Sequence, residues 1–236
     1  MKINIHRSAD RGLSALGWLV SRFSFSFSRY WNPDRLGFGR LLVLNDDLIA
    51  PSTGFDTHHH DDMEIITIVT EGELAHKDNT GAEGLIRPGE VQIMSAGTGI
   101  EHSEHNPSSE NYLKLLQIWI LPEKGGLPPR YEQKAFSPHD RYNKLQQVVS
   151  PDANNGSLKI FQQAWLSLCD LDAGKEISYE IHNPNSGLFI FVIDGELQSA
   201  DQQILKGDSL ELSEISAPVK IIAKQNSQLL FIEVPL

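Results

Sequence analysis

Almost every periodic segment of this 236-residue chain repeats every second residue, which is the period of a β-strand. The segment RFSFSFSRY alternates without a break and is predicted to place Phe23, Phe25 and Phe27 on one face. Other short segments are rich in Ile, Val, Leu and Phe and are bounded by Gly, Pro, Asn or Asp: MEIITIVT, VQIMSA, LKLLQIWIL, LKIFQQAWLSL, LFIFVIDG and LLFIEVPL. Many short strands with turns about every ten residues predict an all-β sandwich or barrel architecture.

Two stretches of the chain resemble each other. The first reads IVTEGELAHKD and then LIRPGEVQIMSAG; the second reads FVIDGELQSAD and then ILKGDSLELSE. Self-similarity on this scale predicts that a whole domain has been duplicated. The stretch between the copies, EKGGLPPRYEQKAFSPHDRYN, has adjacent glycines, three prolines and many charges, as connectors do. We predict an N-terminal domain at 1–124, a connector at 125–143 and a C-terminal domain at 144–236.

Composition limits what the chain binds. A formal net charge of −11 argues against nucleic acid as a direct ligand, because that affinity depends on Lys and Arg neutralising phosphates. It also disfavours an anionic membrane surface, and no run approaches the roughly 18 apolar residues that span a bilayer. The single cysteine, Cys169, allows no internal disulfide, and we expect it to be a small buried hydrophobe rather than a catalytic thiol. A reducing compartment fits this usage, so we expect a soluble, cytoplasmic protein, and we expect a monomer.

Two histidine clusters give the strongest indication of function. Five of the nine histidines lie in them: His58, His59 and His60, then His102 and His105. On an extended strand His58 and His60 share a face, and so do His102 and Glu104. Two such pairs on neighbouring strands can bring four side chains to one point inside a barrel. Imidazole and carboxylate together suit iron, manganese, nickel, copper or zinc, and the absence of sulfur ligands argues against a purely structural zinc.

The segment THHHDD alone is also compatible with an exposed polar loop. The second cluster, EHSEHN, repeats the same-face spacing after the glycine-rich turn SAGTG. Buried ionisable groups at this density need a compensating charge, which a metal ion supplies. We therefore predict one metal site, held by His58, His60, His102 and Glu104.

The same residues resemble a known family. The stretch GFDTHHHDDME resembles the first cupin motif, and PGE followed by GTGIEHSEHN resembles the second, each with small differences in spacing. Within the cupins, SFSFSRYWNP, THHHDDMEI, SAGTGIEHSEHNPS, LQIWI and PRYEQ are similar to the pirin family. The resemblance covers most of residues 10–160 and weakens over the C-terminal third. It implies two tandem cupin (jelly-roll) β-barrel domains, a bicupin.

The resemblance also bears on the ligands. In pirins three histidines and one glutamate hold the metal, which implies the same four residues here. His59 and His105 stand where other residues are common in the family, and neither is an expected ligand. Glu64 occupies the carboxylate position used in other cupins and lies in phase with His58 and His60, so it remains an alternative or outer ligand.

The second copy lacks the ligand set. Aligning Gly195 with Gly72 puts Ile181, His182 and Asn183 against the first cluster. Aligning Gly207 with Gly89 puts Lys220 and Ile222 against His102 and Glu104. We therefore expect one divalent transition metal per chain, with Fe(II) first and Mn, Ni, Cu or Zn as alternatives, and His182 as a solitary surface or turn histidine.

The resemblance implies an activity like that of quercetin 2,3-dioxygenases, which open the central flavonol ring with O2 and release carbon monoxide. Glu104 would be the catalytic base for the flavonol hydroxyl. We expect a pocket wall that includes Ile66, Met94 and Leu116, and we expect Trp119, Trp165 and the Phe stripe to be core residues. The partners would be a small aromatic substrate and O2.

Two alternatives stay open. Pirins also act as metal-dependent binding partners of other proteins, so a non-enzymatic regulatory role with a protein partner is the competing class. The third possibility is an oxygenase or isomerase reaction on another small enol or aromatic. An oxygenase predicts a hydrophobic cavity that reaches the metal, whereas a regulator predicts an exposed, metal-sensitive surface.

Overall fold

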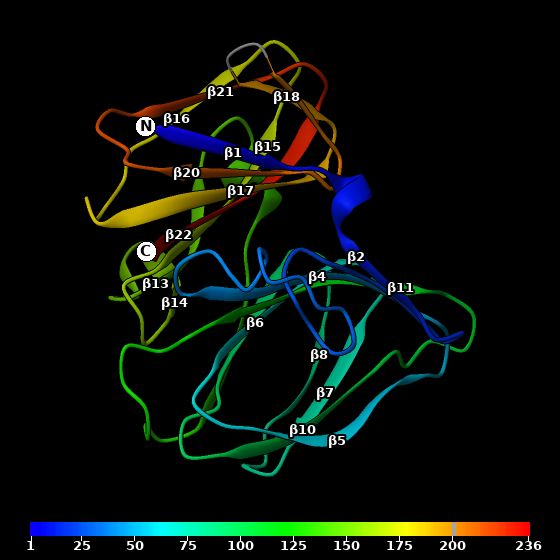
Figure 1. Ribbon diagram of the computed structural model, residues 1–236. Coiled ribbons are helices and arrows are strands. Elements are labelled where there is room, and N and C mark those ends of the chain that lie inside the picture. The colour runs from blue at the N-terminus through cyan, green and yellow to red at the C-terminus, as the bar shows by residue number, and fades with distance from the viewer. Residues whose placement is uncertain (200–201) are drawn as a thin grey trace.

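The structure, a computed structural model, is described for residues 1–199 and 202–236. It is built almost entirely of β-strands, and each half of the molecule pairs a seven-stranded sheet with a four-stranded sheet (Figure 1). This confirms the predicted all-β class and the pair of jelly-roll domains. The only helices described are three 3₁₀ turns, η1 (Ser8–Asp10), η2 (Pro138–Arg141) and η3 (Asn154–Gly156). No helix in the described part of the chain is long and apolar enough to cross a lipid bilayer.

The N-terminal domain holds both histidine clusters. Its large sheet has the order β12 (Arg130–Ala135), β9 (Glu90–Ser95), β6 (Glu64–Glu71), β11 (Leu113–Ile120), β4 (Leu41–Ile49), β3 (Leu19–Phe23) and β2 (Gly12–Ala15). Its small sheet has the order β5 (Gly54–His60), β10 (Ile100–His105), β7 (Leu74–Asp78) and β8 (Glu83–Ile86).

The C-terminal domain repeats this plan. Its large sheet has the order β1 (Lys2–His6), β20 (Ser209–Ser213), β17 (Ser186–Asp194), β22 (Ser227–Pro235), β15 (Trp165–Leu171), β13 (Gln146–Ser150) and β14 (Leu158–Lys159). Its small sheet has the order β16 (Glu176–Tyr179), β21 (Val219–Ala223), β18 (Glu196–Ser199) and β19 (Gln202–Leu205).

Two segments tie the domains together. The first strand of the chain, β1, pairs with β20 in the C-terminal sheet, where Figure 1 shows it in dark blue. Strand β12, inside the segment predicted as a connector, pairs with β9 and extends the N-terminal sheet. The connector therefore contains regular structure, and the N-terminal strand lies in the opposite domain.

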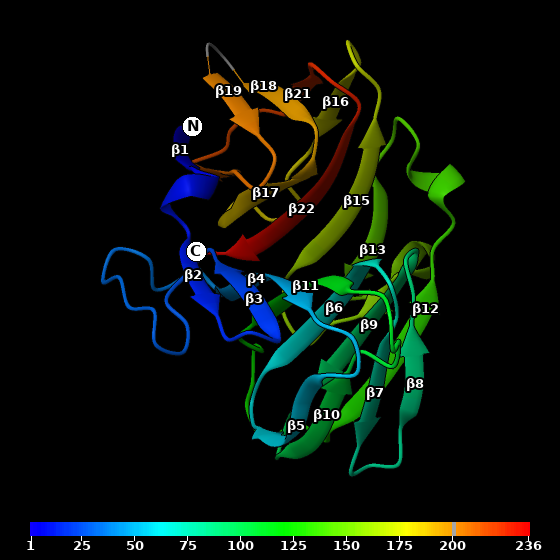
Figure 2. The same cartoon turned by 90° about the vertical axis from the view of Figure 1, so that its right-hand side faces the viewer.

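The two large sheets also pack against each other (Figure 2). One continuous apolar cluster contains Ile66 and Leu116 from the N-terminal domain and Phe189 and Leu230 from the C-terminal domain. Phe25 lies 5.8 Å from Phe189, ring centroid to ring centroid. The outward faces of the two large sheets therefore form one core shared by both domains. Burying each such side chain stabilises the fold by about 1.5–3 kcal/mol.

The predicted phenylalanine stripe does not stay on one face. Strand β3 ends at Phe23, after which Phe25 turns into the shared core. Phe27 turns back to lie 5.4 Å from Phe23, between ring centroids. The prediction that all three rings share a face was wrong, because unbroken sequence alternation does not keep the chain extended. Cys169, by contrast, is a free and fully buried cysteine, as predicted.

Candidate metal centre and its cavity

Strands β5 and β10 carry the two histidine clusters side by side. They pair antiparallel, with His102 opposite His58 and Ile100 opposite His60. A register shift between His102 and Glu104 puts Glu104 opposite Phe55. Because strand side chains alternate between faces, His58, His60, His102 and Glu104 all point into the domain while His59 points outward and is exposed.

Three imidazoles meet at one point. His58, His60 and His102 each offer a ring nitrogen, and these atoms lie within 4.8 Å of one another. The ring centroids are separated by 4.4 Å for His58 and His102, 4.7 Å for His58 and His60, and 4.9 Å for His60 and His102. This grouping was predicted from strand parity.

Glu104 joins the cluster through His102. Its carboxylate forms a second group with His102 and His76, again with donor atoms within 4.8 Å of one another and all three residues buried. His102 belongs to both groups, so the four predicted ligands form two overlapping sets rather than one equidistant set.

Burial sets the protonation of these groups. Burial, together with the neighbouring His58 imidazole, lowers the pKa of His102 to about 3 and that of His60 to about 4. Both rings are therefore neutral near pH 7 and keep a lone pair for a metal ion. Burial acts in the opposite direction on the carboxyl group and raises the pKa of Glu104 to about 7.

The donor atoms of this centre fit a divalent transition metal. Both ring nitrogens of the buried His102 lack a hydrogen-bond partner, and so does Oε1 of Glu104. An unpaired buried polar group costs roughly 1–3 kcal/mol, and metal coordination would remove that cost. Three imidazoles with one carboxylate are a donor set that divalent transition metals accept.

His76 was missed in the sequence. It lies on β7 directly opposite Glu104 of β10. Its Nε2 lies 3.3 Å from Oδ2 of Asp78, its ring stacks on Tyr131 with centroids 4.6 Å apart, and its Nδ1 is buried without a partner. The segment LAHKD alternates, and an inward Leu74 would have placed His76 on the inner face.

Glu64 belongs to neither of the two donor groups. Its carboxylate accepts hydrogen bonds from Ser95 Oγ at 3.0 Å and from the backbone N–H of Phe161 at 3.3 Å. The parity argument that set it in phase with His60 assumed a continuous strand. The chain instead turns between β5 and β6, where Asp62 has a left-handed φ of 41°.

A cavity of about 240 Å³ leads to the metal centre. Eight of its seventeen lining residues are aromatic or aliphatic, and the polar ones come from β2, β3, β4, β5, β10, β11 and the loop after β3. The lining residues are Ser14, Leu16, Trp18, Leu19, Ser21, Phe23, Phe27, Ser28, Asn45, Asp47, Phe55, His58, His60, Ile65, Glu104, Gln117 and Trp119.

On two strands the residue predicted to line the pocket is the neighbour of the residue that does line it. Ile65 and Gln117 line the cavity, whereas Ile66 and Leu116 point into the core shared by the domains. Met94 packs beside the cavity-lining Ile65 without lining the cavity itself. A one-residue error reverses the face because strand side chains have a period of two.

Three aromatic residues that were predicted to be core residues line the cavity instead. The Trp119 ring lies edge-on to His60, with centroids 4.9 Å apart, and 5.3 Å from Phe27. Phe23 and Phe27 line the same space. Three rings predicted as core thus form the wall next to the metal centre.

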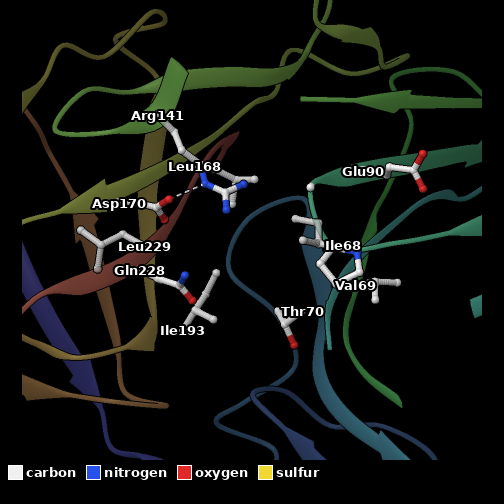
Figure 3. A pocket seen from close by; sticks show the side chains of 12 residues that line it. Ile68, Val69, Thr70, Glu90, Arg141, Leu168, Asp170, Ile193, Gln228 and Leu229 are labelled. Carbon is white, nitrogen blue, oxygen red and sulfur yellow. Dashed lines mark hydrogen bonds and ion pairs between the residues drawn. The ribbon is translucent and has the colours of Figure 1, made fainter. Parts of the chain in front are cut away.

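A smaller cavity of about 70 Å³ lies between the domains (Figure 3). An ion pair between Arg141 and Asp170, 2.8 Å from Nε to Oδ2, closes one side, and Ile68 lies on the other. None of the described metal-ligand groups reaches it. It is a gap at the domain contact and a weak candidate for a site.

The C-terminal domain is apolar at the positions where the N-terminal domain carries its histidines. The pairing of β21 with β16 puts Ile221 opposite Ile177 and Val219 opposite Tyr179, where β10 and β5 carry the histidines. The sequence alignment had instead placed Ile181 and Ile222 at the positions of His58 and Glu104, so the predicted correspondence between the two domains differs from the observed strand pairing. The prediction that His182 is solitary was wrong: its Nδ1 lies 2.8 Å from Oε2 of the buried Glu233.

Comparisons with known proteins agree with this architecture. The chain matches the pirin family model over residues 6–120 and a model described as the quercetinase C-terminal cupin domain over residues 147–234. The second match extends into the region where the sequence motifs weaken. The quercetin 2,3-dioxygenase of Escherichia coli K12 is 41% identical over 237 residues, covering 99% of each chain.

Solved structures give the same result. The crystal structure of the bacterial pirin YhhW from Escherichia coli in complex with nickel(II) has a TM-score of 0.93 and 40% identity, and the match covers 99% of both chains. A quercetin 2,3-dioxygenase from Acinetobacter baumannii has a TM-score of 0.74 at 18% identity, covering 98% of this chain and 85% of that one. At that identity the likeness concerns the fold.

Proposed function

This chain belongs to the pirin family, and from that premise we propose that it is a metal-dependent dioxygenase that opens the central ring of a flavonol with O2. Both atoms of dioxygen enter the ring-opened product, and one ring carbon leaves as carbon monoxide. The name of the Escherichia coli relative, a quercetin 2,3-dioxygenase, supports this reaction class. Another small enol or aromatic is the alternative substrate.

The observation that carries the proposal is that the cavity ends at His58, His60 and Glu104. Its walls of Trp119, Phe23 and Phe27 suit a flat aromatic molecule, since aromatic rings favour edge-to-face and offset contacts. Its volume of about 240 Å³ lies just below the roughly 300–1,000 Å³ of most ligand pockets. A protein that acted only through its outer surface would not need this space.

We propose that His58, His60, His102 and Glu104 hold the metal, with Fe(II) as the native ion. When bound, the metal supplies a Lewis-acidic, redox-capable centre at the end of the cavity. The same donor set accepts Mn, Ni, Cu or Zn, and the nickel(II) complex of the Escherichia coli relative fits this range.

Glu104 is the proposed catalytic base. With a pKa raised to about 7 by burial, its carboxyl group can take the proton of the flavonol hydroxyl near neutral pH. Gln117 donates from Nε2 to Oε2 of Glu104 at 2.9 Å and leaves Oε1 unpaired. The free oxygen is therefore the one available to the substrate proton or the metal.

In this proposal the N-terminal domain, 1–124, carries the chemistry, and 144–236 is a domain without metal ligands. The connector, 125–143, adds β12 to the N-terminal sheet, and its Tyr131 stacks on His76. The connector thus completes one wall around the metal centre.

The test is anaerobic reconstitution with Fe(II), Mn(II), Ni(II) or Cu(II), followed by quercetin in air. Loss of flavonol absorbance with release of carbon monoxide supports the proposal, and Glu104→Ala is expected to abolish both. His105→Ala is the matched control, because His105 lies on the same strand but pairs with Asp56 at the surface. Absence of turnover with every metal would favour the metal-dependent binding role instead.

A further inference from the structure

A row of buried polar side chains crosses the inner face of the N-terminal large sheet. Gln117 on β11 pairs with Asn45 on β4 and with Thr67 on β6, and Thr67 pairs with Gln92 on β9. All four are at most 9% exposed. Polar groups in the middle of a domain interior cost free energy unless they are fully paired, so this row requires an explanation.

Only part of the row serves Glu104. Thr67 Oγ1 donates to Gln117 Oε1 at 3.1 Å, and Gln117 donates to Glu104. The ends of the row have no such role: Oδ1 of Asn45 and Oε1 of Gln92 are buried without a hydrogen-bond partner. Of these two ends, Asn45 lines the cavity and Gln92 does not.

A second polar pair lies beside Asn45. Asp47, two residues along β4, accepts a hydrogen bond from Ser21 Oγ through Oδ1. Asp47 is 5% exposed and Ser21 is 2% exposed, and both line the cavity. Asn45 and Asp47 therefore present an unpaired amide oxygen and a carboxyl group to the same space.

The C-terminal domain provides an internal comparison. There Phe231 on β22 pairs with Ile190 on β17, which pairs with Leu210 on β20, in the register that Gln117, Thr67 and Gln92 occupy in the N-terminal domain. All three are fully buried and apolar, whereas Ser167 on β15, which pairs with Phe231 as Asn45 pairs with Gln117, is buried and polar. The fold therefore does not need polar side chains at the positions of Gln117, Thr67 and Gln92, and the buried amide of Asn45 occurs only in the domain that has the cavity and the metal centre, where the other domain has a smaller hydroxyl group.

We propose that Asn45 and Asp47 form a hydrogen-bonding subsite for a second polar group of the aromatic substrate, a ring hydroxyl remote from the one that Glu104 deprotonates. This inference rests on the proposed function and deepens it. A phenolic hydroxyl donates to Asn45 Oδ1 and fills the hydrogen bond that the buried amide oxygen lacks, so the substrate class is a polyhydroxylated flavonol. A ligand without that hydroxyl leaves Asn45 Oδ1 unpaired, which disfavours its binding.

The experiment measures ligand binding without turnover. Nickel-loaded protein is kept anaerobic, and quenching of tryptophan fluorescence gives the Kd of quercetin and of a flavonol that lacks all other ring hydroxyls. The wild type is expected to prefer quercetin about tenfold, the equivalent of about one hydrogen bond. Asn45→Leu and Asp47→Asn are expected to reduce this preference to near unity through weaker quercetin binding.

Gln92→Met is the matched control, because it removes a buried amide from the same row away from the cavity. It is expected to keep the wild-type preference. Metal affinity by chelator competition and the thermal midpoint show that each variant is folded and loaded. If Asn45→Leu does not fold, Asn45→Asp takes its place at this position. This variant keeps a hydrogen-bond acceptor and is expected to fold and to retain the preference for quercetin.

Three results would overturn the inference. An unchanged preference in Asn45→Leu and Asp47→Asn would remove the subsite, and so would equal wild-type affinity for the two flavonols. If the wild type still turned over quercetin in either case, the proposed function would stand without the subsite. If neither flavonol bound and neither was turned over, both proposals would fall together.

Discussion

The side-chain amide of Gln117 donates a 2.9 Å hydrogen bond from Nε2 to Oε2 of Glu104, and both residues are buried. This bond fixes one oxygen of the proposed base and lowers its pKa against the larger effect of burial. Thr67 in turn holds the amide of Gln117 at 3.1 Å. The orientation of Glu104 is thus determined by the large sheet and not by its own strand alone.

Replacing Gln117 should change the pH profile of turnover. Gln117→Leu removes the hydrogen bond that lowers the pKa of Glu104, so this pKa should rise. The acidic limb of the profile of kcat/KM against pH should therefore move to higher pH. We also expect kcat at pH 7 to fall about tenfold, in line with the loss of one bond to a charged group. A variant whose profile is unshifted would show that Gln117 has no influence on the base.

The histidine ligands should dominate metal affinity. His102→Ala removes the one residue shared by both donor groups, and chelator competition should show a loss of more than about 100-fold, above the range for residues that only support a ligand. His59→Ala is the control, because this adjacent ring is exposed and outside both groups. Equal affinity in the two variants would contradict the assigned centre.

Asp78 should support the metal centre through His76. Its carboxylate lies 3.3 Å from His76 Nε2 and is itself held by the backbone N–H of Thr80 at 2.9 Å. Because His76 packs against the ligand His102 and is not itself one of the four proposed ligands, Asp78→Asn should weaken metal binding by about tenfold, the lower end of the range for residues that support a ligand. Lys77→Ala, exposed on the same strand, should leave the affinity unchanged; a comparable loss there would point to a general weakening of β7.

Stability should depend on pH through two buried carboxyl groups. Burial raises the pKa of both Glu104 and Asp47 to about 7. Because the folded pKa values lie above the unfolded ones, this stabilising contribution is full below about pH 4 and is lost as pH rises through about 7. Below about pH 6.5 the buried His60 and His102 act in the opposite direction, because their folded pKa values of about 4 and 3 lie below the unfolded value. The test therefore compares variants: in chelator-treated protein the thermal midpoint of Glu104→Gln relative to the wild type should rise as pH increases from about 4 to about 7, and a constant difference would contradict the raised pKa of Glu104.

Metal affinity should change in the opposite direction. Binding needs the ionised Glu104 carboxylate, so the added stability from Ni(II) should increase as pH rises through about 7. The imidazoles of His60 and His102 do not compete in this range, because their pKa values are about 4 and 3. A metal-induced thermal shift that is flat over roughly two pH units around pH 7 would exclude Glu104 as the titrating ligand.

The core between the domains should hold the molecule together. Phe189 is fully buried and contacts Phe25 and Phe38 from the N-terminal domain, with centroids at 5.8 and 6.0 Å. Phe189→Ala should lower the free energy of unfolding by about 3–5 kcal/mol in urea denaturation. Val20→Ala, 37% exposed, is expected to change it by less than about 0.5 kcal/mol; similar losses would mean that the shared core adds little.

Local rules predicted the residues that depend only on neighbours in the chain. The alternation within THHHDD and within EHSEHN placed His58, His60 and His102 on inner faces, and the structure brings their ring nitrogens together. The same rule failed for Glu64, because a turn at Asp62 resets the phase between β5 and β6. Parity holds within one strand and carries no information across a turn.

Long-range pairing decided what the alternation could not. Whether Ile65 or Ile66 faces the cavity depends on which side of β6 packs against the second domain. Likewise Phe25 leaves the stripe because Phe189, far along the chain, offers it a buried contact. Neither partner can be recognised from the segment that contains the residue.

The sequence by itself determined the all-β class, the duplication and the three histidines that converge, because each follows from a two-residue period and from donor chemistry. Only the tertiary structure decided the role of His76, the aromatic cavity and the polar row beneath Glu104. These features arise where β7, β10, β11 and β4 come together, and contact between strands distant in sequence depends on packing energies that no single segment encodes.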